Sequence, residues 1–292
     1  MKISTAINNI LNDDPFSAIA LIAKGGFDCL DLSLFSLAQG EHLYLGDDWE
    51  LYAKKLKEEA EKNNVYFNQA HAPFTMNMKN YLSGGEEADD ILFRITRSIE
   101  FAAAVGAKII VVHPVQCMDY NNFNRDEILE INKVFYGKLA PTALKCGIKI
   151  AIENMWRNNI FNGNIICSVC SDANELAKYV DECNKQHNCF GACLDIGHCT
   201  LTGVDPIYAI NVLGDRLIAL HVHDNDFVND THSLPLLYKI NFAPIMAALK
   251  HIGYSGEFTL ETDSYFAKMP PELLPDAITF AAKVCRYLTK DM

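Results

Sequence analysis

The 292-residue sequence lacks the features that would place the protein in a membrane or on an export route. No apolar run approaches the ~20 residues that a membrane-spanning helix needs. The first residues, MKISTAINN, do not combine a basic segment with the apolar stretch of a secretory signal. We therefore expect a cytoplasmic protein that does not cross a membrane.

Positive charge is also scarce. The chain has 25 basic and 37 acidic residues, which gives a formal charge of −12. Such a surface repels phosphate backbones on average, so nucleic acid is not the expected partner unless basic residues gather in one groove. A bound metal cluster would cancel part of this charge, because several of the acids would be its ligands.

Nucleotide-binding and disulfide motifs are missing as well. No GxGxxG follows a predicted strand, and no GK[ST] sequence occurs. The ten cysteines lie mostly among apolar neighbours, as at Cys29, Cys193 and Cys285, which indicates buried free thiols. The CxxC pair Cys167 and Cys170 has no second pair at a zinc-site spacing, so it does not predict a zinc or redox site.

Six short apolar runs each end in a residue that can bind a metal ion or transfer a proton. They are NQAH, IIVVH, IKIAIE, FGACLD, LIALH and FTLE, and they end at His71, His113, Glu153, Asp195, His221 and Glu261. A short apolar run of this kind is typical of a buried parallel strand. The carboxyl ends of such strands meet on one face of an α/β barrel, where the active site lies. We therefore expect the six side chains to gather in one site.

Strand and helix patterns alternate eight times along the chain. The predicted strands are 1–6, 27–34, 65–71, 107–113, 148–153, 189–195, 216–221 and 257–261. The predicted helices are 15–24, 49–63, 86–105, 125–145, 171–186, one that opens at 205–206, 242–251 and 275–289. Eight repeats favour a (β/α)8 TIM barrel over an open sheet, and residues 1–292 are predicted to form one domain. The irregular segments 72–85, 154–170 and 224–240 follow strand ends, so they should form the walls of a pocket.

The mixture of imidazole and carboxylate groups predicts a divalent metal site. Asp195 and His198 are three residues apart at a strand exit, and the dense segments HVHDN (221–225) and DTH (230–232) follow. This donor set suits zinc, manganese, iron or cobalt better than magnesium or calcium. Each residue alone has an ordinary structural explanation, but charged groups at buried strand ends are costly unless they are paired or coordinated. The nearest basic residues are Arg157 and Arg216.

Four other histidines are not expected in the site. His42, His187 and His251 lie in polar surroundings and should be solvated. His223 is expected to point away from His221 and to have a structural role.

The chain resembles the xylose-isomerase-like TIM-barrel superfamily over nearly its whole length. That group includes sugar phosphate isomerases and epimerases, ketose 3-epimerases, inosose dehydratases and the apurinic endonucleases of family 2. The matching segments are HAPF (71–74), VVHP (111–114), AIEN (151–154), LDIGH (194–198), HVHDND (221–226), DTH (230–232) and LKHIGYSGEFTLE (249–261). Together they indicate the superfamily more than they indicate the reaction.

The resemblance implies a metal-dependent isomerase or epimerase acting on a sugar, sugar phosphate or related polyol. Its metal ligands would be Glu153, Asp195, His221 and Glu261, with one essential manganese, zinc or similar ion. Glu153 and Glu261 would move a proton next to a polarised carbonyl from opposite faces of the sugar. His198 would orient a substrate hydroxyl or carbonyl.

Two other reactions of the superfamily stay open. The endonucleases hold up to three metals, and their further ligands correspond to His71, His113, His198, Asp230 and His232, which implies phosphodiester hydrolysis. The charge of −12 and the loop APFTMNMKN after His71 argue against a DNA substrate. An inosose dehydratase-like lyase is the other alternative.

Residues on the expected active-face loops complete the prediction. Phe74, Trp156, Arg157 and Asn225 are predicted to contact the substrate, and Phe161 is a further candidate for an apolar wall. A small-molecule carbohydrate is the expected partner, and a homo-oligomer is compatible with the sequence. No phosphate-binding motif distinguishes a free sugar from a sugar phosphate.

Overall fold

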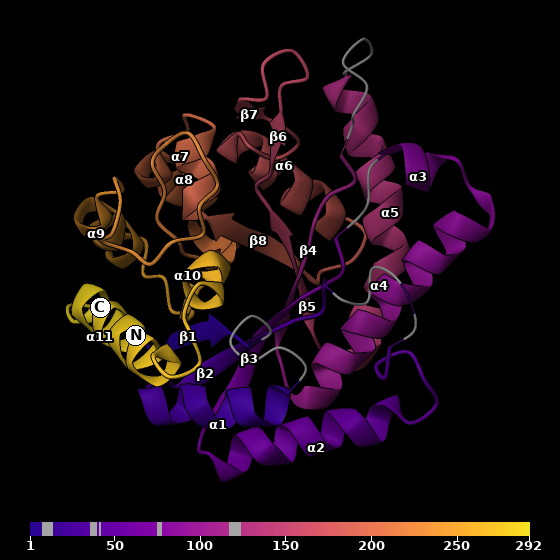
Figure 1. Cartoon of the computed structure of the whole chain (residues 1–292). Helices are drawn as coiled ribbons and strands as arrows, with labels where there is room; N and C mark the ends of the chain where they lie inside the picture. The colour runs from indigo at the N-terminus through magenta and orange to yellow at the C-terminus, as the bar shows by residue number, and fades with distance from the viewer. Residues whose placement is uncertain (8–13, 36–39, 41, 75–77, 117–123) are drawn as a thin grey trace.

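The computed structural model describes residues 1–7, 14–35, 40, 42–74, 78–116 and 124–292, and it contains the predicted TIM barrel (Figure 1). Eight parallel strands form one sheet in the order β10-β1-β2-β3-β4-β5-β8-β9. A parallel bridge between Val222 and Leu260 brings the two edges of the sheet together. The strands are β1 (Ile3–Ala6), β2 (Cys29–Ser33), β3 (Tyr66–His71), β4 (Ile109–Val112), β5 (Lys149–Glu153), β8 (Phe190–Asp195), β9 (Leu217–His221) and β10 (Phe258–Leu260).

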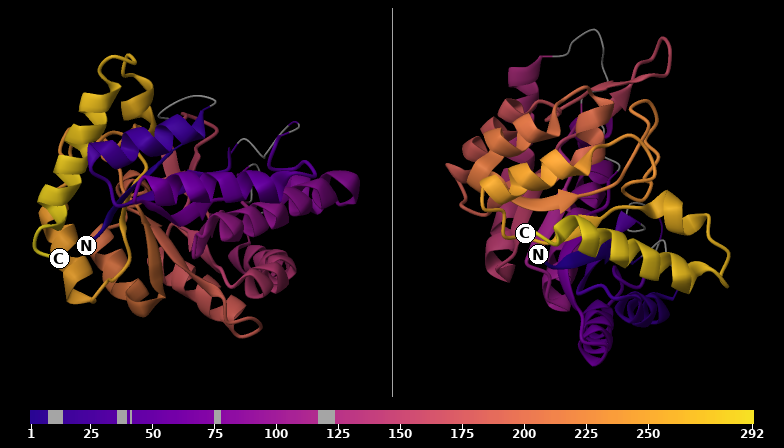
Figure 2. Two further views of the ribbon diagram at one scale, coloured as in Figure 1. Left: turned by 90° about the horizontal axis from the view of Figure 1, so that it is seen from below. Right: turned by 90° about the vertical axis from the view of Figure 1, so that its left-hand side faces the viewer.

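Helices surround the strands on the outside of the barrel (Figure 2). They are α1 (Pro15–Gly25), α2 (Trp49–Lys62), α4 (Gly85–Val105), α5 (Arg125–Cys146), α6 (Ala173–Asn184), α8 (Pro206–Leu213), α9 (Phe242–His251) and α11 (Leu274–Thr289). Gly26 and Gly106 end α1 and α4 in the left-handed conformation, with φ of 104° and 101°, which glycine adopts without strain. No helix in the described ranges is long and apolar enough to cross a membrane.

Two short structures lie in segments that were predicted to be irregular: α3 (Met78–Leu82), and the antiparallel hairpin of β6 (Trp156–Asn158) and β7 (Ile165–Cys167). Three further short elements were not predicted: α7 (Ile196–Leu201), the 3₁₀ turn η2 (Gly214–Arg216) and α10 (Asp263–Ala267). The prediction that 154–170 is irregular is therefore wrong. Strands of three residues are too short to show an alternating pattern.

Small apolar side chains form a floor inside the barrel beneath the strand ends. Val111, Ala151, Cys193 and Ala219 are buried together on β4, β5, β8 and β9. Each lies two residues before a predicted site residue, and residues two apart share one face of a strand. The site residues therefore point into the barrel, directly above this floor.

An ion pair joins the last helix to the start of the barrel. Arg286 on α11 donates to both carboxylate oxygens of Asp28, at 2.8 and 2.7 Å, and the amide of Ile3 donates to the same carboxylate at 2.8 Å. Partial burial raises the pKa of Asp28, but Arg286 and the Ile3 amide outweigh it, so the pKa lies below the ordinary 3.8. The ionised carboxylate thus stabilises the folded state at pH values above the ordinary pKa of 3.8.

Asp28→Asn should lower the free energy of unfolding by only about 1 kcal/mol at pH 7, because 46% of the Arg286 side chain is solvent-exposed. A depressed folded-state pKa gives stability that is present above the unfolded pKa and is lost as the pH falls through the folded one. The difference between wild type and variant in urea unfolding should therefore shrink below about pH 4. Glu58→Gln, which removes an exposed partner of Lys54, is the control and should change little. If the difference in the free energy of unfolding between wild type and Asp28→Asn stays constant down to pH 3, the ionised carboxylate of Asp28 is not what stabilises the fold.

Candidate metal centre and active site

The strand ends deliver the predicted residues to one end of the barrel. His71, Glu153, Asp195 and His221 are the last residues of β3, β5, β8 and β9. His113 and Glu261 directly follow β4 and β10. The prediction from the six apolar runs is confirmed in its geometry: these side chains lie together.

The principal donor group consists of Glu153, Asp195, His221 and Glu261. One ligand atom of each lies within 4.8 Å of the others. His221 Nδ1 is 2.7 Å from Glu153 Oε1 and 3.4 Å from Glu261 Oε2. All four residues are buried, and Asp195 Oδ2 has no hydrogen-bond partner in the described part of the chain. Three carboxylates lie around one imidazole, and no lysine or arginine of the described residues pairs with them. Such a group is costly unless a cation joins it, so this donor set fits a divalent metal ion.

His71 and His113 lie beside this group. Their Nε2 atoms are 3.0 Å apart and are 3.5 and 2.7 Å from Glu153 Oε2. His71 Nδ1 donates to the Ala72 carbonyl at 2.7 Å, because a carbonyl can only accept. The Nε2 lone pair of His71 is therefore turned toward Glu153, as metal-binding histidines require.

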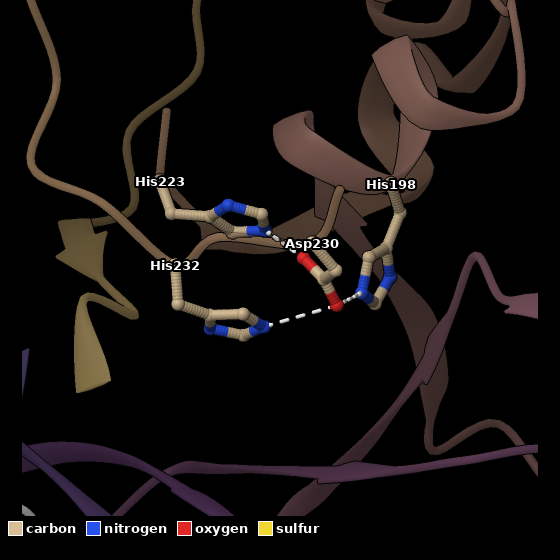
Figure 3. Close-up of side chains that lie close together, drawn as sticks. All are labelled: His198, His223, Asp230 and His232. Carbon is tan, nitrogen blue, oxygen red and sulfur yellow. Dashed lines mark hydrogen bonds and ion pairs between the residues drawn. The ribbon is translucent and has the colours of Figure 1, made fainter. Parts of the chain in front are cut away.

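A second donor group consists of His198, His223, Asp230 and His232 (Figure 3). The His232 Nε2 atom is 3.2 Å from Asp230 Oδ2, and His198 Nε2 is 3.8 Å from the same oxygen. The Nδ1 atoms of His198 and His232 donate to the carbonyls of Asn154 and Glu261, at 2.8 and 3.0 Å. In the neutral form of each ring, Nε2 therefore carries the lone pair, and this atom faces Asp230.

His223 does not have the position that we expected. It is fully buried in the second donor group, with Nε2 3.2 Å from Asp195 Oδ1 and 3.6 Å from Asp230 Oδ1. Its ring stacks on His232 at a centroid distance of 4.3 Å. The prediction that it points away from His221 is wrong, because residues two apart in an extended segment share a face.

A cavity of about 560 Å³ opens above the two groups. Its described lining is Phe35, His71, Phe74, His113, Gln116, Glu153, Met155, Trp156, His198, Asp230, His232, Glu261, Asp263, Ser264 and Ala267. This described lining contains no lysine or arginine. Phe74 and Trp156 thus lie where they were predicted, and Trp156 Nε1 also donates to Asp230 Oδ2 at 3.0 Å.

The other predicted contact residues lie outside this lining. Arg157 Nε donates to the Cys167 carbonyl across the hairpin at 3.2 Å. Asn225 is fully buried, and its amide donates to the Gly197 carbonyl at 3.0 Å. Phe161 is 88% exposed. His42, His187 and His251, which were not expected in the site, belong to none of the donor groups found among the described residues.

The two glutamates of the principal group have pKa values that differ in opposite directions from the ordinary value. Burial raises the pKa of Glu153, but the adjacent His221 and His113 outweigh burial and hold it well below its usual range. Burial raises the pKa of Glu261 well above its usual range, against the effect of His221 and His232. Burial also lowers the pKa of His113 to about 4, despite the nearby Glu153. Without a bound ion, the two neighbouring glutamates thus have pKa values on opposite sides of the ordinary value.

Gly197 is required by the close approach of His223. A Cβ at this position would overlap the His223 ring. Gly197→Ala should therefore cost about 1–3 kcal/mol of stability and displace the ring from the second donor group. Thermal unfolding measures the first effect. Gly46→Ala is the control, because its Cβ would meet only the Leu43 carbonyl at 3.7 Å. Equal melting temperatures for both variants would contradict the packing argument.

Comparisons with known proteins agree with this architecture. The sequence model described as "Xylose isomerase-like TIM barrel" matches residues 19–284. A D-tagatose 3-epimerase-like protein of known structure is 26% identical, with a TM-score of 0.71 and coverage of 97% of this chain and 99% of that one. An IolI protein with bound zinc is 18% identical, with a TM-score of 0.74 and coverage of 99% and 98%, which shows a shared fold. An uncharacterized protein of Methanocaldococcus jannaschii is 28% identical over 264 residues, 89% of this chain and 83% of its own length.

Proposed function

This chain belongs to the xylose isomerase-like TIM-barrel family, and from that premise we propose that it is a metal-dependent isomerase or epimerase of an unphosphorylated sugar or polyol. The observation that carries the proposal is the pairing of Glu153 and Glu261. Both belong to the principal donor group, both line the cavity, and their pKa values are driven apart. The D-tagatose 3-epimerase-like relative and the zinc-containing IolI structure support it.

The ionised Glu153 is the base of the proposed reaction. It removes a proton from the carbon next to the substrate carbonyl, and the electron pair of the C–H bond moves toward the carbonyl oxygen. Glu261 is the acid of the proposed reaction: it returns a proton to the reacting carbon from the other face while the electron pair moves back from the oxygen, so substrate and product are epimers. In an aldose–ketose isomerisation the proton returns to the neighbouring carbon instead, and the hydroxyl proton moves to the former carbonyl oxygen. A divalent ion held by Glu153, Asp195, His221 and Glu261 would polarise the carbonyl and lower the cost of charge on its oxygen.

His198 and the aromatic walls position the substrate. The Nδ1 proton of His198 is held by the Asn154 carbonyl, so Nε2 offers an acceptor to a sugar hydroxyl. Phe74 and Trp156 provide apolar faces in the same cavity. A sugar ring, with one apolar face and a hydroxylated edge, fits such a lining.

The lining residues that the structure describes include no basic side chain, which favours a neutral substrate. A phosphate group buried there would face carboxylates and have no lysine or arginine partner among these residues. Metal-loaded enzyme should therefore turn over D-tagatose or D-fructose with a kcat/KM at least about 10²-fold above that for the corresponding 6-phosphate. The comparison uses the same chromatographic assay for both sugars. A higher kcat/KM for the phosphorylated sugar would contradict the proposal that the substrate is unphosphorylated.

Phosphodiester hydrolysis is the second candidate, and the second donor group is the observation that favours it. His198, His223, Asp230 and His232 form a separate set of converging nitrogen and oxygen atoms, which a multinuclear hydrolase needs. Against it, the described lining of the cavity contains no basic residue that would bind a nucleic acid backbone. Cleavage of an abasic-site oligonucleotide, lost in Asp230→Asn, would move this candidate ahead. A dehydratase shares the first proton transfer and differs in releasing water from its product.

A further inference from the structure

A chain of buried polar side chains runs through the interior of the barrel beneath the principal donor group. Ser4 Oγ donates to Asn68 Oδ1 at 2.6 Å, and Asn68 Nδ2 donates to Thr259 Oγ1 at 3.3 Å. Thr259 Oγ1 donates to Gln69 Oε1 at 3.3 Å, and Gln69 Nε2 donates to Asp31 Oδ2 at 3.0 Å. All five residues are buried, and they come from β1, β3, β10 and β2. Interior polar groups are costly, so a connected series of them points to a purpose beyond packing.

The hydrogen bonds of this series of polar side chains all run in one direction, and the carboxylate of Asp31 determines that direction. An ionised carboxylate only accepts, so Gln69 must turn its amide nitrogen toward Asp31 and its oxygen toward Thr259. Thr259 then donates to Gln69 and accepts from Asn68, whose oxygen accepts from Ser4. The whole series therefore fixes the position of Asp31.

Asp31 in turn faces His221. Its Oδ2 atom is 3.6 Å from His221 Nε2, and both side chains are almost fully buried. In the described part of the chain, His221 Nε2 and Asp31 Oδ1 have no hydrogen-bond partner. The other nitrogen of the ring, Nδ1, faces Glu153 and Glu261. One end of the imidazole thus meets the donor group, and the other end meets a carboxylate that the barrel interior holds in place.

We propose that Asp31 is a positioning residue for the metal centre: it holds the Nε2 proton of His221, so that the Nδ1 lone pair faces the principal donor group. The inference rests on the proposed function, because it assumes that His221 binds the metal. A histidine that binds metal through one nitrogen must carry its proton on the other, and a carboxylate partner there fixes the ring and raises its basicity. A small approach from 3.6 Å would complete the hydrogen bond.

The test measures Mn²⁺ affinity by calorimetric titration of chelator-stripped protein. Asp31→Asn should weaken binding about 10–100-fold. Ser4→Ala, at the far end of the same series of hydrogen bonds, should change the Mn²⁺ affinity by no more than about two-fold while it lowers the melting temperature. If Asp31→Asn does not fold, Gln69→Leu removes the donor that holds Asp31, and it should weaken binding by several-fold.

A double-mutant cycle separates a specific role from general damage. If Asp31 acts through His221, Asp31→Asn should cause no further loss of Mn²⁺ affinity in the His221→Ala background. Unchanged affinity in Asp31→Asn, or an equal loss in both backgrounds, overturns the inference. If His221→Ala itself leaves Mn²⁺ binding unchanged, the proposed metal centre fails instead, and the two failures are therefore distinguishable.

Discussion

Replacing Glu153 with glutamine should lower turnover by at least about 10³-fold while the barrel stays folded. The amide keeps the shape of the side chain but cannot take a proton, and its oxygen binds a metal ion more weakly than a carboxylate does. Glu153 also lies 2.7 Å from both His221 Nδ1 and His113 Nε2, so its loss disturbs the base and two neighbouring imidazoles together. Steady-state assays of the metal-loaded variant, with circular dichroism for the fold, measure the effect.

Glu261→Gln provides the matched comparison. If Glu261 returns the proton, this variant should also lose turnover, yet it should still exchange the substrate proton that Glu153 removes. Exchange of the substrate proton without turnover would show that Glu153 removes the proton and that Glu261 is needed only to return it. Full activity in either variant would refute the mechanism with two glutamates.

Stripping the protein of divalent metal should abolish turnover and lower the melting temperature. The principal donor group gathers three buried carboxyl groups around one imidazole, and a bound cation would stabilise their ionised forms together. An ion present at 100 times its Kd contributes about 2.7 kcal/mol, which for a chain of this size is roughly 4–5 °C. Adding Mn²⁺, Zn²⁺ or Co²⁺ should restore both properties.

Two isosteric variants locate the essential ion. Asp195→Asn should lose turnover and the metal-dependent rise in melting temperature, because Asp195 belongs to the principal donor group. Asp230→Asn lies in the second donor group and should keep at least a tenth of the turnover. If Asp230→Asn is as inactive as Asp195→Asn, the second group is essential, and a multinuclear reaction becomes the better explanation.

The barrel and the principal donor group could be predicted because each depends on a local pattern. An apolar run that stops at Glu153 or Asp195 identifies both a buried strand and the residue at its carboxyl end. Parallel strands then bring these ends together, whatever lies between them in sequence. The helices could be predicted from the amphipathic spacing of their apolar residues and, for several of them, from a glycine at the end.

What the sequence did not predict depends on positions within strands and on loop paths. Asp31 lies in the middle of a strand rather than at its end, so its contact with His221 had no terminal signal. His232 lies in a loop with a left-handed φ of 41°, and neither this turn nor its stacking on His223 follows from a residue pattern. The hairpin that carries Trp156 has strands of three residues, below the length at which alternation is visible.

Metal-dependent proton exchange tests the central claim most directly. Stripped protein, incubated with D-tagatose or D-fructose in D2O, is titrated with Mn²⁺, and deuterium incorporation next to the carbonyl is followed by NMR. We predict that exchange rises until one ion is bound per chain, then levels off, and that Asp195→Asn shows none. Exchange that persists in the stripped protein, or no exchange from either sugar at full metal loading, would contradict a metal-dependent proton transfer at Glu153 and Glu261.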